Sequence, residues 1–408
     1  MKNITGYNKI TLSAVLLLSG CFSSTHNVSV TDRTDSQVIE HQDQDTSSLF
    51  KASESSLWAG ENISASFVSF SSLMPTGQKD AFWKIGTSVQ YCDPSISDTF
   101  MYYCFNTGCL HNDLSCNCYI GNADLFLSYR GYWYYDRINS SNAYELICHD
   151  PSSNNRKIIA EYEMKDDGSV SERITGMSAS YGKLYVNISR QEYDLETGKQ
   201  MSTGYYDVID LKDGSHQIIL ENDGDISLFG VYQNKAVILK NEMNASVNGQ
   251  LSRNDTLLIY DLQSAESVYI TDTDNGFRCF SDSHQLIDHE NLVYINGQKI
   301  HILNLENMDD QAVYTSDGII SRAWFFGRNI RLIEKDDTGK HLSMISADGT
   351  LKEQYPSLLD EAGIMVMGYS YSTEHGQIGS ISNGNGHLKD VWISEQDLLE
   401  SRIDHVIG

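Results

Sequence analysis

The feature that most constrains the fold is a repeated unit of two short apolar strands joined by a polar turn. Each copy follows another hairpin of similar length, so that four strands recur every 40 to 60 residues. Five copies are clear and a sixth is weaker: 144–160, 206–220, 257–270, 300–314, 342–355 and 391–399. Repetition of four strands at this spacing is the sequence signature of a β-propeller.

A ring of blades explains why such a unit must repeat. A single four-stranded sheet cannot bury both of its faces, but neighbouring sheets stacked around an axis bury them for one another. A β-sandwich would not explain the recurrence. We therefore predict an all-β chain in which six blades fit best and seven are the alternative. Strands near 66–70, 82–91 and 100–105 should complete the blade that closes the ring, with an N-terminal strand joining the C-terminal sheet.

The N-terminus carries a different kind of signal. Lys2 and Lys9 precede the apolar run 10–18, and the small residues Ser19 and Gly20 precede Cys21. A charged start, an apolar segment of this length and a small-residue cleavage site are typical of a secretory signal peptide. The cysteine at that point makes the segment resemble the lipobox of a bacterial lipoprotein. The resemblance implies cleavage before Cys21 and a lipid on its sulfur.

These features predict four segments. Residues 1–20 would be the lipoprotein signal peptide, and 21–60 the lipidated cysteine with a disordered tether rich in Ser, Thr, Asp and Gln. Residues 61–400 would be the propeller, with a Cys/His-rich loop at 104–118, and 401–408 a C-terminal tail. The lipid would hold the protein on the extracytoplasmic face of the cell membrane.

The charge balance excludes one class of partner. The formal net charge is −26 at pH 7 with histidines neutral. Such a surface repels phosphate backbones, so nucleic acid is not an expected partner. Aromatic residues make up 10% of the chain, including 24 Tyr, which favours strands over disorder.

The densest group of metal-ligand residues spans fifteen positions. It consists of Cys104, Cys109, His111 and Cys116, with Cys118 close behind. Tight spacing of three thiols and an imidazole predicts a structural zinc site. An exported cysteine cluster is equally compatible with disulfides. In either case we expect a structural role, because no general base or open ligand position accompanies the cluster.

These residues also carry a family resemblance. Tyr102-Tyr103-Cys104, Cys109-x-His111 and Cys116, followed by a Tyr-rich strand and repeated hairpins, are similar to uncharacterised lipoproteins of Gram-positive bacteria. Those proteins are described as carrying TolB-like or low-density-lipoprotein-receptor-like propeller repeats. The resemblance covers residues 61–400, and Cys118 departs from its pattern. The resemblance implies a propeller fold and a location at the cell membrane, but it implies no activity.

The absence of catalytic motifs shapes the functional expectation. The sequence contains no Gly-x-Ser-x-Gly elbow, no His-Glu-x-x-His pair and no phosphate-binding loop. We therefore expect a non-enzymatic module that binds a protein, peptide or glycan at the cell surface. The alternatives are a propeller enzyme acting on glycans or sugars, such as a glycosidase, lyase or dehydrogenase, and a scaffold subunit of an envelope complex.

Overall fold

The computed structural model divides the chain into two compact units, 1–45 and 46–408, and the fold described below belongs to the second. It describes residues 63–407 with gaps at 65, 68–72, 77–79, 98, 164–168, 195–196, 223–225, 246–250, 271–276, 279–286, 289, 327–328, 347, 357–364, 374, 383–387 and 395–405. The predicted signal peptide, Cys21 and the tether lie outside the described residues.

The described residues form strands and no helix. The first two sheets contain β3 (Leu73–Pro75), β4 (Phe82–Lys84), β5 (Gln90–Cys92) and β6 (Met101–Tyr102), then β7 (Leu125–Tyr129), β8 (Tyr132–Ile138), β9 (Tyr144–Asp150) and β10 (Asn155–Tyr162). The third and fourth contain β11 (Val170–Ser180), β12 (Lys183–Tyr193), β13 (Gln200–Asp210) and β14 (His216–Asn222), then β15 (Ile226–Tyr232), β16 (Lys235–Ala245), β17 (Leu251–Asp261) and β18 (Glu266–Ile270).

The remaining sheets complete the unit. The fifth contains β19 (Phe277–Arg278), β20 (Ile287–Asp288), β21 (Asn291–Asn296), β22 (Lys299–Asn304) and β23 (Asp310–Thr315). The sixth and seventh contain β24 (Ile319–Phe326), β25 (Asn329–Asp336), β26 (Gly339–Ser346) and β27 (Leu351–Pro356), then β28 (Met365–Ser372), β29 (Gly376–Ser382), β30 (Leu388–Ser394) and β31 (Val406–Ile407). None of the described segments is a helix long and apolar enough to span a membrane.

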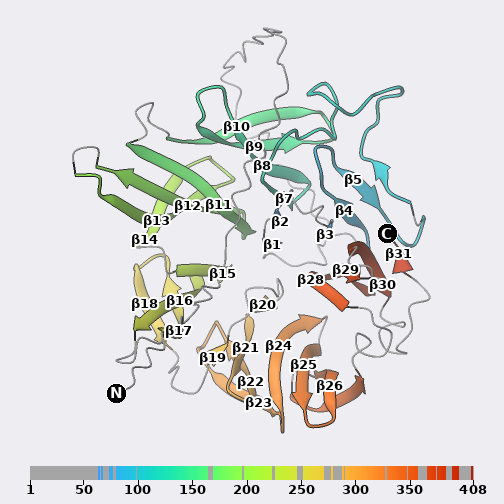
Figure 1. Ribbon diagram of the computed structural model, residues 1–408, viewed down its shortest axis with the longest axis vertical. Coiled ribbons are helices and arrows are strands. Elements are labelled where there is room, and N and C mark those ends of the chain that lie inside the picture. The colour runs from blue at the N-terminus through green and yellow to red at the C-terminus, as the bar shows by residue number, and fades with distance from the viewer. Residues whose placement is uncertain are drawn as a thin grey trace, which may run out of the picture. The chain divides into compact units, whose positions relative to one another are not determined.

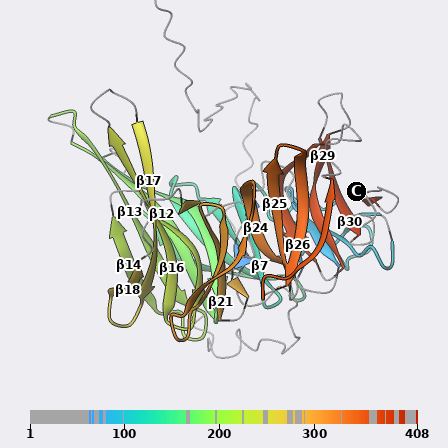
Figure 2. The ribbon, with the colours of Figure 1, turned by 90° about the horizontal axis from the view of Figure 1, so that it is seen from below.

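The arrangement is a β-propeller, as the repeat predicted. Among the described residues the strands form seven antiparallel sheets, and within each the strands follow chain order. Figure 1 shows the sheets placed one after another about a common centre, and Figure 2 shows their strands standing side by side. The repeated unit corresponds to the third and fourth strands of successive sheets, beginning with β9 and β10.

Strand β12 shows how the apolar runs hold the ring together. Leu184, Tyr185 and Val186 are consecutive and all are at most 1% exposed. Leu184 and Val186 pack in a cluster with residues of the second sheet, whereas Tyr185 packs with Val231 and Ile238 of the fourth sheet. Successive side chains in a strand point to opposite faces, so each sheet contributes to two cores.

The N-terminal strands lie elsewhere than predicted. β1 (Ile63–Ser64) pairs with β11, and β2 (Ser66–Phe67) pairs with β7, so both add to the first strands of the third and second sheets. They lie near the centre of the ring in Figure 1. The predicted sharing of an N-terminal strand with the C-terminal sheet is therefore wrong. That sheet is instead completed by β31, which falls within the predicted tail 401–408 and pairs with β30.

Side chains join the first and last sheets. Asp80, just before β4, accepts hydrogen bonds from the Thr373 hydroxyl at 2.8 Å and from the His375 amide at 2.6 Å. Its other oxygen lies 2.8 Å from Nδ1 of His375. The indole of Trp392 donates to Oγ1 of Thr373 at 2.8 Å. The 293-residue separation between Asp80 and Thr373 makes this contact the closure of the ring.

Replacing the closing carboxylate should weaken the fold. We expect Asp80→Ala to lower the free energy of unfolding by about 2–4 kcal/mol, because it leaves buried donors without an acceptor. Denaturant unfolding followed by tryptophan fluorescence measures the loss. Asp213→Ala is the control, since Asp213 caps an exposed turn through Ser215. Equal losses in the two variants would contradict a closing role for Asp80.

Candidate functional site: a Cys/His cluster between two blades

The Cys/His loop, residues 103–120, connects the first sheet to the second and brings the predicted ligands together. One ligand atom from each of Cys104, Cys109, His111 and Cys116 lies within 4.8 Å of all the others. Sγ of Cys116 lies 3.5 Å from Sγ of Cys104 and 3.4 Å from Nδ1 of His111. Ligands around a tetrahedral zinc, with Zn–S near 2.3 Å and Zn–N near 2.0 Å, are separated by roughly 3.3–3.8 Å.

Tight turns place these side chains. The amide of Cys109 donates to the carbonyl of Asn106 at 3.3 Å, and Gly108 between them has φ 79°. His111 also has a left-handed φ, 56°, which is uncommon for a side-chain-bearing residue. Asp113 accepts from the Ser115 amide at 2.8 Å and so starts the turn that presents Cys116.

Neighbouring groups fix the imidazole of His111. Its ring stacks on Tyr102, with centroids 4.3 Å apart and planes at 22°. The hydroxyl of Ser88 donates to the His111 carbonyl at 2.5 Å. Val89, next to Ser88, donates its amide to Cys118 and accepts from the amide of Tyr103, which pins both ends of the loop to the first sheet.

The thiols differ in their acidity. The amide of His111 donates to Sγ of Cys109 at 3.4 Å, and this bond lowers the pKa of the Cys109 thiol. Partial burial raises the pKa of Cys104 and of Cys116 to about 11. These two thiols are therefore protonated at neutral pH, and a nearby cation would favour their thiolate form.

Cys118 adds a fifth donor to the group. Its Sγ lies 3.3 Å from Sγ of Cys116 and 3.7 Å from Nδ1 of His111, and its side chain is buried. The four cysteines of this loop and Cys148 are free thiols. A disulfide bond is about 2.05 Å long, so these sulfur atoms are neighbours without being bonded.

The second sheet holds the loop from the other side through Arg156, a residue that the sequence analysis missed. Arg156 lies on β10, and its guanidinium donates to the carbonyls of Leu114 at 2.8 Å, Cys116 at 2.8 Å and Tyr119 at 2.9 Å. Asn154 also donates to the carbonyl of Ser115. Arg156 has no motif around it, and only its contacts identify it as a positioning residue.

Aromatic rings form the base of the loop. Trp83 packs edge-on against Tyr103 and Trp133, at centroid separations of 5.0 and 5.5 Å. His149 is fully buried edge-on to Trp133, and burial together with the charge of Arg156 lowers its pKa to about 3. An imidazole with this pKa stays neutral at physiological pH, so His149 acts as a packing residue.

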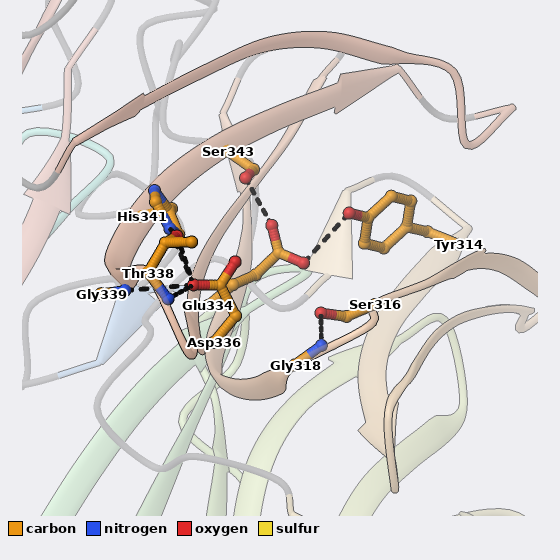
Figure 3. A network of polar contacts seen from close by, with 9 residues as sticks. All are labelled: Tyr314, Ser316, Gly318, Glu334, Asp336, Thr338, Gly339, His341 and Ser343. Atoms are coloured by element: carbon orange, nitrogen blue, oxygen red, sulfur yellow. Dashed lines mark hydrogen bonds and ion pairs between the residues drawn. The ribbon is translucent and has the colours of Figure 1, made fainter.

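Other buried acids tie neighbouring sheets together. Glu334 on β25 accepts a 3.0 Å bond from the hydroxyl of Tyr314 on β23 and a short bond from Ser343 (Figure 3). Nearby, the exposed Asp336 accepts from the hydroxyl of Thr338 within its own hairpin. The same arrangement joins Tyr162 on β10 to Asp207 on β13 at 2.9 Å. Since each acid is bonded to side chains of its own or the adjacent sheet, these networks are structural.

The fold and the cluster together define a β-propeller with a Cys/His centre between its first two blades. No protein-family model and no curated protein matches the chain. Solved structures do. The chain is similar to the propeller domain of the Trilobed protease from Pyrococcus furiosus, described as having an open velcro topology, with 11% identity and TM-score 0.42, covering 76% of this chain and 93% of that one.

Two larger enzymes are similar as well. Dipeptidyl peptidase 4 of Porphyromonas gingivalis is 8% identical with TM-score 0.45, over 89% of this chain and 61% of that chain. Acylaminoacyl peptidase of Pyrococcus horikoshii is 12% identical with TM-score 0.38, over 66% of this chain and 42% of that chain. This chain therefore spans about half the length of these two peptidases.

The comparisons correct two expectations. We expected a non-enzymatic binding module and a chain that is not an enzyme, whereas the similar structures include an acylaminoacyl peptidase, a dipeptidyl peptidase and prolyl endopeptidases. At these sequence identities the similarity shows a shared fold only. The peptidase activity is a property of the similar proteins.

The hydrogen bonds from Arg156 to the Cys/His loop, which we call the Arg156 clamp, can be tested by hydrogen exchange. We expect Arg156→Ala to speed the exchange of amides in 114–119 by about 10- to 100-fold, because three hydrogen bonds to carbonyls are lost. Arg156→Lys should not restore protection, since an ammonium cannot present the guanidinium fork. Lys157→Ala, at the exposed neighbouring position, is the control. Unchanged exchange in Arg156→Ala would contradict the clamp.

Proposed function

We propose that this chain is a zinc-stapled propeller lipoprotein, in which Cys104, Cys109, His111 and Cys116 hold one structural zinc ion. The observation that carries the zinc proposal is the convergence of three thiols and an imidazole within 4.8 Å. Three sulfurs and one nitrogen are a donor set typical of closed, structural zinc sites. Cys118 would then stand beside the metal as a neighbouring thiol.

The role of the metal follows from the size of the first sheet. Its four strands have two or three residues each, whereas β11 to β14 of the third sheet have seven to eleven. Strands this short supply few ladder hydrogen bonds. A structural zinc contributes folding free energy directly. It would therefore stabilise the loop that joins this short-stranded blade to its neighbour.

Metal analysis tests the zinc proposal. The full chain purified without chelator should contain about one zinc per chain, and Cys116→Ser should lose most of it because a tetrahedral site needs all four ligands. Cys148→Ala is the matched control, since Cys148 is a buried thiol in the cluster between the second and third sheets. Chelation should also expose residues 104–118 to hydrogen exchange while β12 stays protected.

Two results would contradict the zinc proposal. One is equal metal content in Cys116→Ser and Cys148→Ala. The other is a chain that holds no zinc and has its loop cysteines joined in disulfides.

We also propose that lipid on Cys21 attaches the protein to the extracytoplasmic face of the cell membrane. The support is the sequence at 2–21, with its two lysines, short apolar run and small residues before the cysteine. A single acyl chain gives marginal binding, so stable attachment needs the multiple chains of a lipoprotein anchor.

Lipidation has a direct readout. When the full chain is produced in a bacterial host, the mature N-terminal peptide should begin at Cys21 and carry the mass of the lipid. Cys21→Ala should leave the signal uncleaved and the lipid absent. Mass spectrometry distinguishes the two, and Cys148→Ala serves again as the control. A mature N-terminus at any other residue would contradict the proposal.

A further inference from the structure

Exposed large apolar side chains are concentrated in the stretch of sequence that leads into and contains the Cys/His loop. Among the described residues, fourteen large hydrophobic side chains are exposed, and six of them fall between 96 and 114. We call these six the apolar loop face: Ile96, Met101, Tyr102, Phe105, Leu110 and Leu114. Leu110 is 81% exposed and Phe105 67%. Exposed apolar side chains that are concentrated in this way mark an interaction surface.

The charge of this segment sets it apart from the rest of the chain. Charged residues make up 21% of the whole sequence, but between 99 and 118 the single one is Asp113. The carboxylate of Asp113 is occupied by the amide and hydroxyl of Ser115. A net charge of −26 would keep most of this protein away from anionic surfaces, and this segment adds a single negative charge to that repulsion.

The loop cannot hide these side chains by collapsing. Tyr102 is held against the ring of His111, and Phe105 packs edge-on to Tyr103 at 5.1 Å. The Arg156 guanidinium fixes the carbonyl of Leu114. Leu110 lies between two of the cluster residues, Cys109 and His111. The apolar side chains are therefore presented by a segment that several contacts hold in place.

We propose that the apolar loop face docks into the headgroup and acyl boundary of the membrane to which the protein is anchored. This inference rests on the proposed lipidation of Cys21. About 40 residues of sequence separate Cys21 from β1. The anchor thus keeps a bilayer within reach. Aromatic and aliphatic side chains without charge suit its interfacial layer.

Depth-dependent quenching tests the docking. The lipidated full chain is reconstituted into phosphatidylcholine vesicles containing acyl-brominated phosphatidylcholine, which quenches tryptophan on contact. Leu110→Trp adds a reporter at the loop face, and Ile319→Trp is the matched control at another exposed apolar position, 57% exposed. The emission added by Leu110→Trp should fall about twofold, as for a side chain some 5–10 Å into the boundary. The control should not change.

Flotation of the vesicles separates the two proposals. A chain that floats and is quenched at position 110 supports both. A chain that floats with no quenching at 110 overturns the docking and leaves the lipid anchor standing. Shielding of position 110 from aqueous acrylamide without lipid quenching indicates contact with a second copy of this chain and overturns membrane docking. A chain that does not float overturns both proposals.

Discussion

The ring depends on a closing contact made by side chains. The first and last sheets share no strand among the described residues, so backbone pairing does not join the ends of the ring. Asp80 supplies the link by accepting hydrogen bonds from Thr373 and His375. The indole of Trp392 in turn donates a hydrogen bond to Thr373. Gly376 allows this close approach, because a Cβ there would lie 2.5 Å from the Trp392 ring and from the carbonyl of Ile393.

The same principle operates between neighbouring blades. Tyrosines on the outer strands donate to buried acids on the next sheet, as Tyr162 does to Asp207 and Tyr314 to Glu334. Burying a carboxylate is costly unless hydrogen bonds satisfy it. The high tyrosine content therefore serves the packing of sheets, and some of the acids belong to the interior rather than to the solvated surface.

The repeat made the outer strands predictable, because apolar alternation and polar turns are local signals. The Cys/His cluster was also predictable, since its ligands are close in sequence. Two features were not. β1 and β2 are two residues each, and their partners lie far along the chain, so no local pattern indicates where they pair. Arg156 contacts the loop through backbone carbonyls. Every residue has a backbone carbonyl, so the sequence gives no sign of which ones Arg156 binds.

The position of β1 and β2 has a consequence for how the protein folds. Ile63 pairs with Ala179, and Ser66 with Phe126, so the start of the propeller finds its place only after the second and third sheets exist. A chain is synthesised from its N-terminus, yet β1 must wait for its partner more than a hundred residues later, and β2 for its partner about sixty residues later. Contacts of such long sequence separation slow folding. The centre of the ring is therefore among the last parts of the blade assembly to form.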